Sequence, residues 1–239
     1  YKHNDMQDLE AKILATPCSR GLIVSDAVFS MDGDIVDLPA LVELGKKYHL
    51  LTMIDEAHAT GVIGKTGHGT LEHFGSTCKP DILMGTLSKA LGSEGGYACS
   101  SKVIIDYLKN KARSFIFATS QAPAALAAAL RAIEVLEEEP QRAQSLQHNV
   151  DFFLNALHAE GVKAYSPTAI IPVIIGDEAT ALQVADELLA NGVLAPAIRY
   201  PTVAKGTARL RIALMATHTE AELTQTAKLI GAAIKKYQK

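Results

Sequence analysis

The sequence predicts an α/β fold, with a mostly parallel sheet covered by helices and a smaller α/β domain after it. Short apolar runs of strand length alternate with stretches of helical spacing along most of the 239 residues, which is typical of strand–helix–strand units. These runs are apolar at nearly every position, as in strands buried on both faces. A run of glutamates ends at Pro140. We expect a domain boundary there, between a first domain over residues 1–140 and a second over residues 141–239.

Each element of the first domain follows from a local pattern. Asn4 and Asp5 can cap a helix that ends near Ala15, because Pro17 follows shortly after. The helical spacing of residues 38–48 places a proline in the first turn, where it is tolerated. Buried strands are expected at residues 21–25, 50–54, 81–85 and 95–100, and further helices at 101–111 and 123–136.

The second domain is expected to be a small α/β unit. Its expected elements are a helix from 140 to about 160, a strand at 170–175, a helix at 178–190, strands at 193–197 and 208–213, and a final helix from Thr219.

Composition excludes several classes of protein. With 23 Lys and Arg against 26 Asp and Glu, the net charge is −3, so we expect no nucleic-acid partner. No apolar run reaches the roughly eighteen residues of a membrane-spanning helix, so no membrane partner is expected. The three cysteines (Cys18, Cys78 and Cys99) are odd in number and lack C-x-x-C spacing, which favours a reducing compartment, the cytoplasm.

Polar clusters follow three of the predicted strands. Asp55 and His58 follow one strand, Thr86 and Lys89 another, and Ser30 follows the strand at 21–25. Ligands of open α/β sheets bind at the carboxyl ends of the strands, so we expect these side chains to converge. A lysine in a partly desolvated pocket can form a Schiff base, and an aspartate nearby can keep a ring nitrogen protonated. That pair is typical of a pyridoxal 5′-phosphate (PLP) site.

Four segments resemble the α-oxoamine synthases, in order and with the spacing of that family: residues 29–34, 55–61, 86–92 and 201–211. These are fold-type I PLP enzymes that condense an amino acid with an acyl thioester and release carbon dioxide. The resemblance implies a PLP-binding large domain with a mostly parallel sheet and a small C-terminal domain. It also implies that the N-terminal part of the family fold, with its glycine-rich phosphate loop, is absent from this chain.

The segment at residues 197–203 resembles the family members that serve biotin biosynthesis. This implies L-alanine and pimeloyl-CoA as the amino-acid and acyl-CoA substrates. Glycine with acetyl-CoA, serine with palmitoyl-CoA and glycine with succinyl-CoA stay open, because all these pairs are used within the family. Two departures from the family pattern, at Tyr200 and at residues 215–218, bear on the acyl-chain preference.

The resemblance implies a role for each site residue. Lys89 would carry the cofactor as a Schiff base and then move the substrate proton, Asp55 would pair with the ring nitrogen, and His58 would hydrogen-bond the phenolic oxygen. Ser30 would lie at the same edge of the ring, and Thr86 beside the phosphate.

The remaining implied roles concern the substrate and the partner subunit. Thr119 would contact the phosphate of the neighbouring subunit's cofactor, which implies a homodimer with shared active sites. Arg211 would grip the substrate carboxylate with its guanidinium fork. Thr202 and Asp26 would lie on the substrate side.

Readings from other classes are weaker. Residues 59–66 fit a loosened phosphate loop and residues 55–58 a nucleotide-hydrolysis motif, yet the two adjoin on one strand and cannot flank one nucleotide. Gly67 and Gly69 are also poor residues to open a helix. Asp55, His58, His68 and His73 cluster in sequence without a standard ligand set, so no metal is expected. A non-catalytic synthase subunit would typically lack the lysine that is present here.

Overall fold

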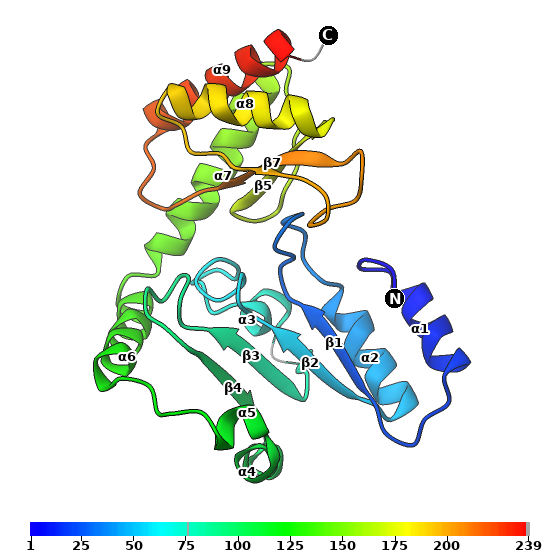
Figure 1. The fold of residues 1–239 in the computed structure, drawn as a ribbon. Helices are drawn as coiled ribbons and strands as arrows, with labels where there is room; N and C mark the ends of the chain where they lie inside the picture. Colours follow the sequence, from blue (N-terminus) through cyan, green and yellow to red (C-terminus); the bar gives the residue numbers. More distant parts are fainter. Residues whose placement is uncertain (76, 238–239) are drawn as a thin grey trace. The chain divides into compact units, whose positions relative to one another are not determined.

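The computed structural model describes residues 1–75 and 77–237, and Figure 1 shows their course as a ribbon. The chain forms two compact units. Unit 1 contains residues 1–28 and 35–140, and unit 2 contains residues 29–34 together with the chain from 141 onward. Residues 29–34, called here the 29–34 loop, therefore pack within unit 2 and not with the predicted domain of residues 1–140.

The sheet of unit 1 is mostly parallel, as predicted. Its strands, in spatial order, are β1 (Leu22–Asp26), β2 (Leu51–Asp55), β3 (Ile82–Thr86) and β4 (Gly96–Ser100). The first three are parallel, and β4 is antiparallel to β3. The register pairs Asp26 with Asp55 and Asp55 with Met84. The carboxyl ends of the three parallel strands therefore meet at one edge of the sheet.

Helices in unit 1 begin at capping side chains. Asp5, Asp37 and Ser101 each accept a hydrogen bond from the backbone N–H three residues on, which satisfies a donor that the first helical turn leaves free. The helices are α1 (Met6–Ala15), α2 (Leu38–Tyr48), α3 (Thr70–Phe74), α4 (Lys102–Lys111), α5 (Arg113–Ile116) and α6 (Pro123–Glu138). Only α3 and α5 were not expected, because helices of five and four residues are too short to show a periodic pattern.

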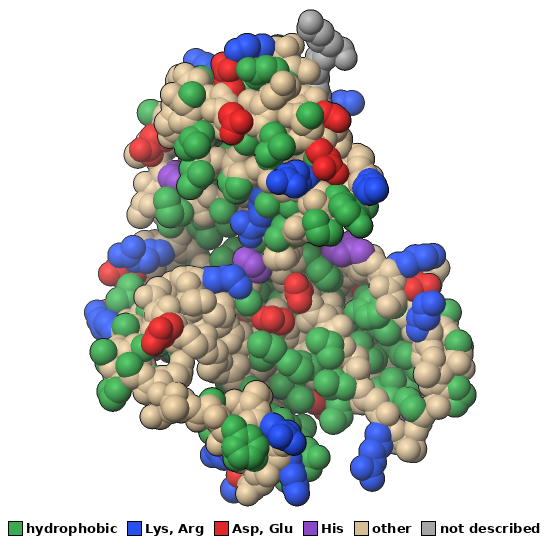
Figure 2. All heavy atoms as spheres, in the orientation of Figure 1, with side chains coloured by type: hydrophobic (Ala, Val, Ile, Leu, Met, Phe, Trp, Pro, Cys, Tyr) green, Lys and Arg blue, Asp and Glu red, His purple; other side chains and the backbone are tan. Residues whose placement is uncertain are grey.

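One face of this sheet is packed and the other is open. Ile23 and Ile54 are buried, and α2 packs against β2. Leu22, Val24 and Leu51 point to the opposite face and are 47%, 48% and 46% exposed. Figure 2 shows hydrophobic side chains gathered over this part of unit 1. The expectation of strands buried on both faces is therefore wrong for the described residues, since neighbouring side chains alternate between faces and only one face is covered.

Unit 2 packs three helices with an antiparallel sheet of order β5-β7-β6. Its elements are α7 (Gln141–Ala159), β5 (Ile170–Gly176), α8 (Glu178–Ala190), β6 (Ala197–Ile198), β7 (Ala208–Ala213) and α9 (Glu220–Tyr237). Helices α7 and α8 both pack against α9, and α8 also packs against β5 and β7. Phe153, Leu157, Ile171, Leu210 and Ile230 are fully buried in this core. Among the described helices of both units, none has the length and apolar character that crossing a membrane requires.

Strand β6 is shorter than the strand predicted at residues 193–197. The Val193 N–H donates to the Leu188 carbonyl at 2.9 Å, and Gly192 has a φ of +81°. These residues therefore close helix α8 instead of extending a strand. Pro196 has no N–H to donate to a ladder, and the strand is confined to Ala197–Ile198.

Candidate functional site

Asp26, Asp55 and Thr86 are the last residues of the three parallel strands. Burial raises the pKa of Asp26, the neighbouring Asp55 carboxylate raises it further, and the charge of Lys89 opposes both. The register sets Asp26 beside Asp55, and Lys89 follows on the turn after the neighbouring strand β3. Of the residues predicted to converge, Asp55, His58, Thr86 and Lys89 lie at or just after the ends of β2 and β3 in unit 1, whereas Ser30 belongs to unit 2.

The turn after β2 carries Asp55 and His58. The Ala57 N–H donates to Asp55 Oδ1 at 2.8 Å, and the Glu56 N–H donates to the Met84 carbonyl at 2.7 Å. Both bonds tie the turn to the end of the sheet. His58 lies half-buried on the same turn.

The buried Glu56 side chain stabilises this turn through hydrogen bonds. Its side chain is 4% exposed, and it accepts hydrogen bonds from the Thr70 N–H at 2.9 Å and the Thr60 hydroxyl at 3.2 Å. Burial raises the pKa of Glu56, and the bonds from Thr70 and Thr60 oppose that shift. Thr60 also shares a hydrogen bond of 2.9 Å with the hydroxyl of Tyr97 on β4. Sequence reasoning missed Glu56 and Tyr97, because these contacts span 14 and 37 residues of the chain.

The turn after β3 carries Lys89. Leu87 and Leu91 on either side of it are buried and pack with Ala129 of α6. The Thr86 hydroxyl shares a hydrogen bond of 2.7 Å with the Ser88 hydroxyl. Lys89 itself is exposed, so the expected desolvated pocket around this lysine is not formed by the described residues. The turn nevertheless fixes the lysine backbone between two apolar anchors.

Thr119 lies on the exposed segment between α5 and α6. Its predicted contact is with a neighbouring subunit, so its role stays a prediction.

A second group of predicted residues lies in unit 2. Strand β7 carries Arg209 and Arg211, and Arg211 Nε donates to the Ser30 carbonyl at 2.6 Å. The surroundings bury this guanidinium partly, which lowers the pKa of Arg211. Among the described residues, no carboxylate forms an ion pair with Arg211. An unpaired, partly buried guanidinium is suited to bind a carboxylate ligand.

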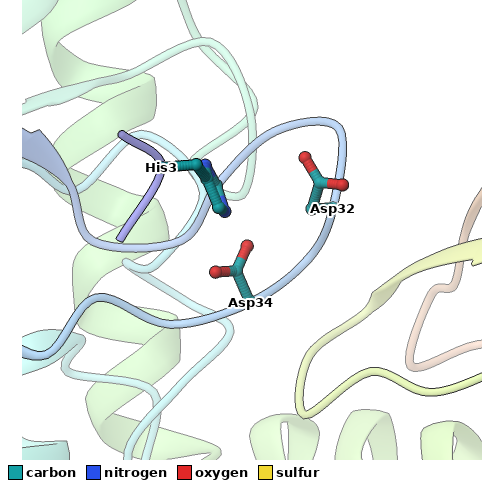
Figure 3. A group of neighbouring side chains, drawn as sticks. All are labelled: His3, Asp32 and Asp34. Atoms are coloured by element: carbon teal, nitrogen blue, oxygen red, sulfur yellow. The ribbon is translucent and has the colours of Figure 1, made fainter. Parts of the chain in front are cut away.

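The 29–34 loop therefore brings Ser30 to Arg211, within unit 2. The loop also carries two carboxylates, Asp32 and Asp34, whose side chains Figure 3 shows. Thr202, the other predicted residue of this unit, lies exposed in the turn before β7, where its N–H donates to the Arg199 carbonyl at 3.0 Å.

A hollow of about 900 Å³ adjoins Arg211 in unit 2. Residues 191–196, the end of β7 and one side of α9 form its walls, and His218 and Glu222 are polar groups within it. Sequence reasoning did not find this hollow, because its walls come from segments with no shared motif.

The structure also argues against a nucleotide-binding phosphate loop at residues 59–66. The Thr66 N–H donates to Glu72 Oε2 at 3.0 Å, the Thr66 hydroxyl to Glu72 Oε1 at 2.7 Å, and the His68 N–H to Glu72 Oε2 at 3.0 Å. Donors that a phosphate loop would offer to a nucleotide are thus held by a side chain of the chain itself. The helix that follows, α3, has only five residues.

Comparison with known proteins places the chain in a family. The family model for aminotransferases of class I and II matches residues 1–230, and the chain belongs to this family of PLP-dependent enzymes. The chain is 48% identical over 240 residues to 8-amino-7-oxononanoate synthase 1 of Bacillus subtilis, covering 100% of this chain and 61% of that protein. It is 47% identical over 227 residues to 8-amino-7-oxononanoate synthase of Exiguobacterium sibiricum, covering 94% and 58%. It therefore spans about three fifths of the length of these relatives.

Solved structures share the fold. A serine palmitoyltransferase of S. paucimobilis with a bound PLP–myriocin aldimine matches with a TM-score of 0.92 and 29% identity, over 99% of this chain and 60% of that one. An 8-amino-7-oxononanoate synthase of Francisella tularensis matches with a TM-score of 0.83 and 28% identity, over 100% of this chain and 69% of that one. The predicted fold class, with its large and small domains, is that of these enzymes.

Proposed function

We propose that this chain provides the catalytic core of an α-oxoamine synthase that condenses L-alanine with pimeloyl-CoA, giving 8-amino-7-oxononanoate and carbon dioxide. The observation that carries the proposal is the sheet register, which sets Asp26 beside Asp55 and puts Lys89 on the turn after the neighbouring strand β3. The 47–48% identity to relatives named for this product supports the choice of substrates.

The donor set of unit 1 fits PLP. Lys89 offers a primary amine to the aldehyde of the cofactor, and Asp55 offers a carboxylate to the ring nitrogen. His58 offers a ring nitrogen to the phenolic oxygen, and Thr86 a hydroxyl to the phosphate. When bound, the cofactor accepts the electron pair released at the α-carbon of the amino acid.

The protein's own residues would bind the substrate and move its proton. Arg211 would bind the α-carboxylate of alanine, and Ser30 fixes its guanidinium through the bond at Nε. Lys89 would take the α-proton and return it after decarboxylation, because a deprotonated amine is a suitable general base. Thr202 and Asp26 would face the substrate.

The proposal includes a homodimer in the cytoplasm. Thr119 would complete the phosphate site of the partner subunit, so each site would need both chains. Cys18, Cys78 and Cys99 are free, which suits a reducing compartment.

A substrate matrix tests the proposal. The whole protein, loaded with PLP, is assayed with alanine, glycine and serine against pimeloyl-, acetyl-, succinyl- and palmitoyl-CoA, and release of free CoA is measured. Alanine with pimeloyl-CoA should give the highest kcat/KM, and preference for another pair would overturn the substrate assignment.

A matched pair of lysine variants tests the site. Lys89→Ala should abolish turnover, while Lys65→Ala, an exposed lysine in the loop after β2, should leave it unchanged. Full activity of Lys89→Ala would refute the mechanism.

A further inference from the structure

Strand β7 carries two arginines with opposite environments. Arg209 is 7% exposed and forms an ion pair with Asp32. Its Nη1 also donates to the Met31 carbonyl at 3.3 Å, and its Nε to the Thr207 carbonyl at 3.1 Å. Arg209 is therefore a buried cation with a carboxylate partner, whereas Arg211 two residues later has no ion-pair partner among the described residues of unit 2.

Both arginines contact the same six-residue loop. Arg209 binds it at Met31 and Asp32, and Arg211 binds it at the Ser30 carbonyl. The loop closes on itself, since the Phe29 N–H donates to the Asp34 carbonyl at 3.0 Å and the Gly33 N–H to the Phe29 carbonyl at 2.8 Å. The backbone from Ser30 to Asp32 thus joins the contacts of the two arginines.

The loop also contacts unit 2 at Gly33. The Gly33 carbonyl accepts from the Thr168 hydroxyl at 2.8 Å and from the Ser166 hydroxyl at 3.4 Å. A Cβ at Gly33 would lie 2.1 Å from the Ile170 carbonyl oxygen. These contacts fix the end of the loop at Gly33, and the Arg209 guanidinium fixes the side next to Ser30.

We propose that Arg209 is a positioning residue for the substrate carboxylate. It holds Met31 and Asp32 so that the Ser30 carbonyl stays on Arg211 Nε. A guanidinium is planar, so a fixed bond at Nε sets its plane and leaves Nη1 and Nη2 as the pair of donors for a carboxylate. The site then accepts a carboxylate at the end of the guanidinium and not along its Nε side. This inference rests on the proposed function, because it takes Arg211 as the carboxylate-binding group.

The test compares Arg209→Met, Arg209→Lys and Asp32→Asn in the whole protein, with Arg131→Met, an exposed arginine on α6, as the matched control. Arg209→Met should raise KM for the amino acid about tenfold and leave KM for the acyl-CoA within about twofold. Arg209→Lys and Asp32→Asn should show the same change more weakly. Arg131→Met should change neither constant.

Hydrogen exchange of the 29–34 backbone amides gives a readout independent of turnover. In Arg209→Met and Asp32→Asn these amides should exchange faster, while those of α9 keep their wild-type rates. Unchanged exchange in the loop, or faster exchange with an unchanged KM for the amino acid, would overturn the proposal. If Arg209→Met does not fold, Asp32→Asn decides by the same criteria.

Failure of the proposed function would look different. Wild-type protein that condenses no amino acid with any acyl thioester would refute the function. The exchange measurement would then still decide whether Arg209 holds the 29–34 loop. Unchanged exchange of the loop amides in Arg209→Met refutes that role whether or not the protein is a synthase.

Discussion

Asp26 and Asp55 are register partners at the carboxyl ends of β1 and β2. Two carboxylates side by side disfavour double ionisation, and desolvation adds to this at Asp26. The strand ends therefore concentrate negative charge where the proposed site needs a cationic ring nitrogen and a lysine. This placement costs stability when both groups are ionised.

Replacing Asp26 by Asn should stabilise the protein at neutral pH. The folded-state pKa of Asp26 is raised, so its contribution to stability is fully present below the ordinary carboxyl pKa and is lost as the pH rises through the raised value. Asp26→Asn should increase the free energy of unfolding near pH 7 by less than about 1 kcal/mol, since water screens this half-buried group, and the difference should vanish below about pH 4. Urea unfolding across this pH range measures it. Asp186→Asn, at an exposed carboxylate on α8, is the control, and a pH-independent difference at Asp26 would contradict the expectation.

Removing the Glu56 side chain should loosen the turn that carries His58. Glu56→Ala leaves the Thr70 N–H and the Thr60 hydroxyl without their acceptor, which should cost about 2–3 kcal/mol. Glu56→Gln keeps an acceptor of the same shape and should cost less. Hydrogen exchange of residues 57–70 measures the effect, and equal protection in Glu56→Ala and the wild type would rule it out.

Local sequence patterns predicted most helices and strands of both units. Helix α2 and strand β7 occur at the predicted residues, because capping, proline placement and apolar runs are properties of neighbouring residues. The strand predicted at residues 193–197 overlaps β6 only at Ala197, because the Val193 N–H closes the preceding helix. The Val193 N–H could bond either to a neighbouring strand or to the end of α8. The packing of α8 decides between them, and the strand propensity of valine does not.

The site was predictable only where the sheet register brings chain segments together. Asp55 and Lys89 lie at or after the carboxyl ends of two neighbouring parallel strands, so the topology alone predicted that they converge, whereas Asp26 was suggested by the resemblance. The association of Ser30 with Arg211 spans 181 residues, and the resemblance to a family suggested both residues without indicating that they touch. Arg209 was missed because a buried arginine and an exposed one look alike in sequence.

Alanine at Gly33 should destabilise unit 2 more than alanine at another glycine of positive φ. Gly33 has a φ of +74°, and its added Cβ would meet the Ile170 backbone at 2.1 Å. Gly161 has a φ of +81° with nothing within 4 Å of its Cβ, so Gly161→Ala bears only the conformational cost of about 1 kcal/mol. Gly33→Ala should lower the free energy of unfolding by at least about 2 kcal/mol more, because the loop must move away from the Ile170 backbone. Thermal unfolding of both variants makes the comparison. Similar losses of stability would show that the loop does not pack tightly against Ile170.

Shortening Leu91 should weaken PLP binding without touching the proposed cofactor contacts. Leu91 is 5% exposed and packs with Leu87 and Ala129, so Leu91→Ala removes an anchor of the turn that carries Lys89 and should cost about 2–4 kcal/mol of stability. Leu130→Ala on α6, where the leucine is 59% exposed, is the matched control and should cost under about 1 kcal/mol. A looser turn holds the Lys89 amine in place for a smaller fraction of time, so the Kd for PLP should rise several-fold in Leu91→Ala alone. Equilibrium titration of the cofactor measures this, and an unchanged Kd in a destabilised Leu91→Ala would show that the leucines support the fold but do not position the lysine.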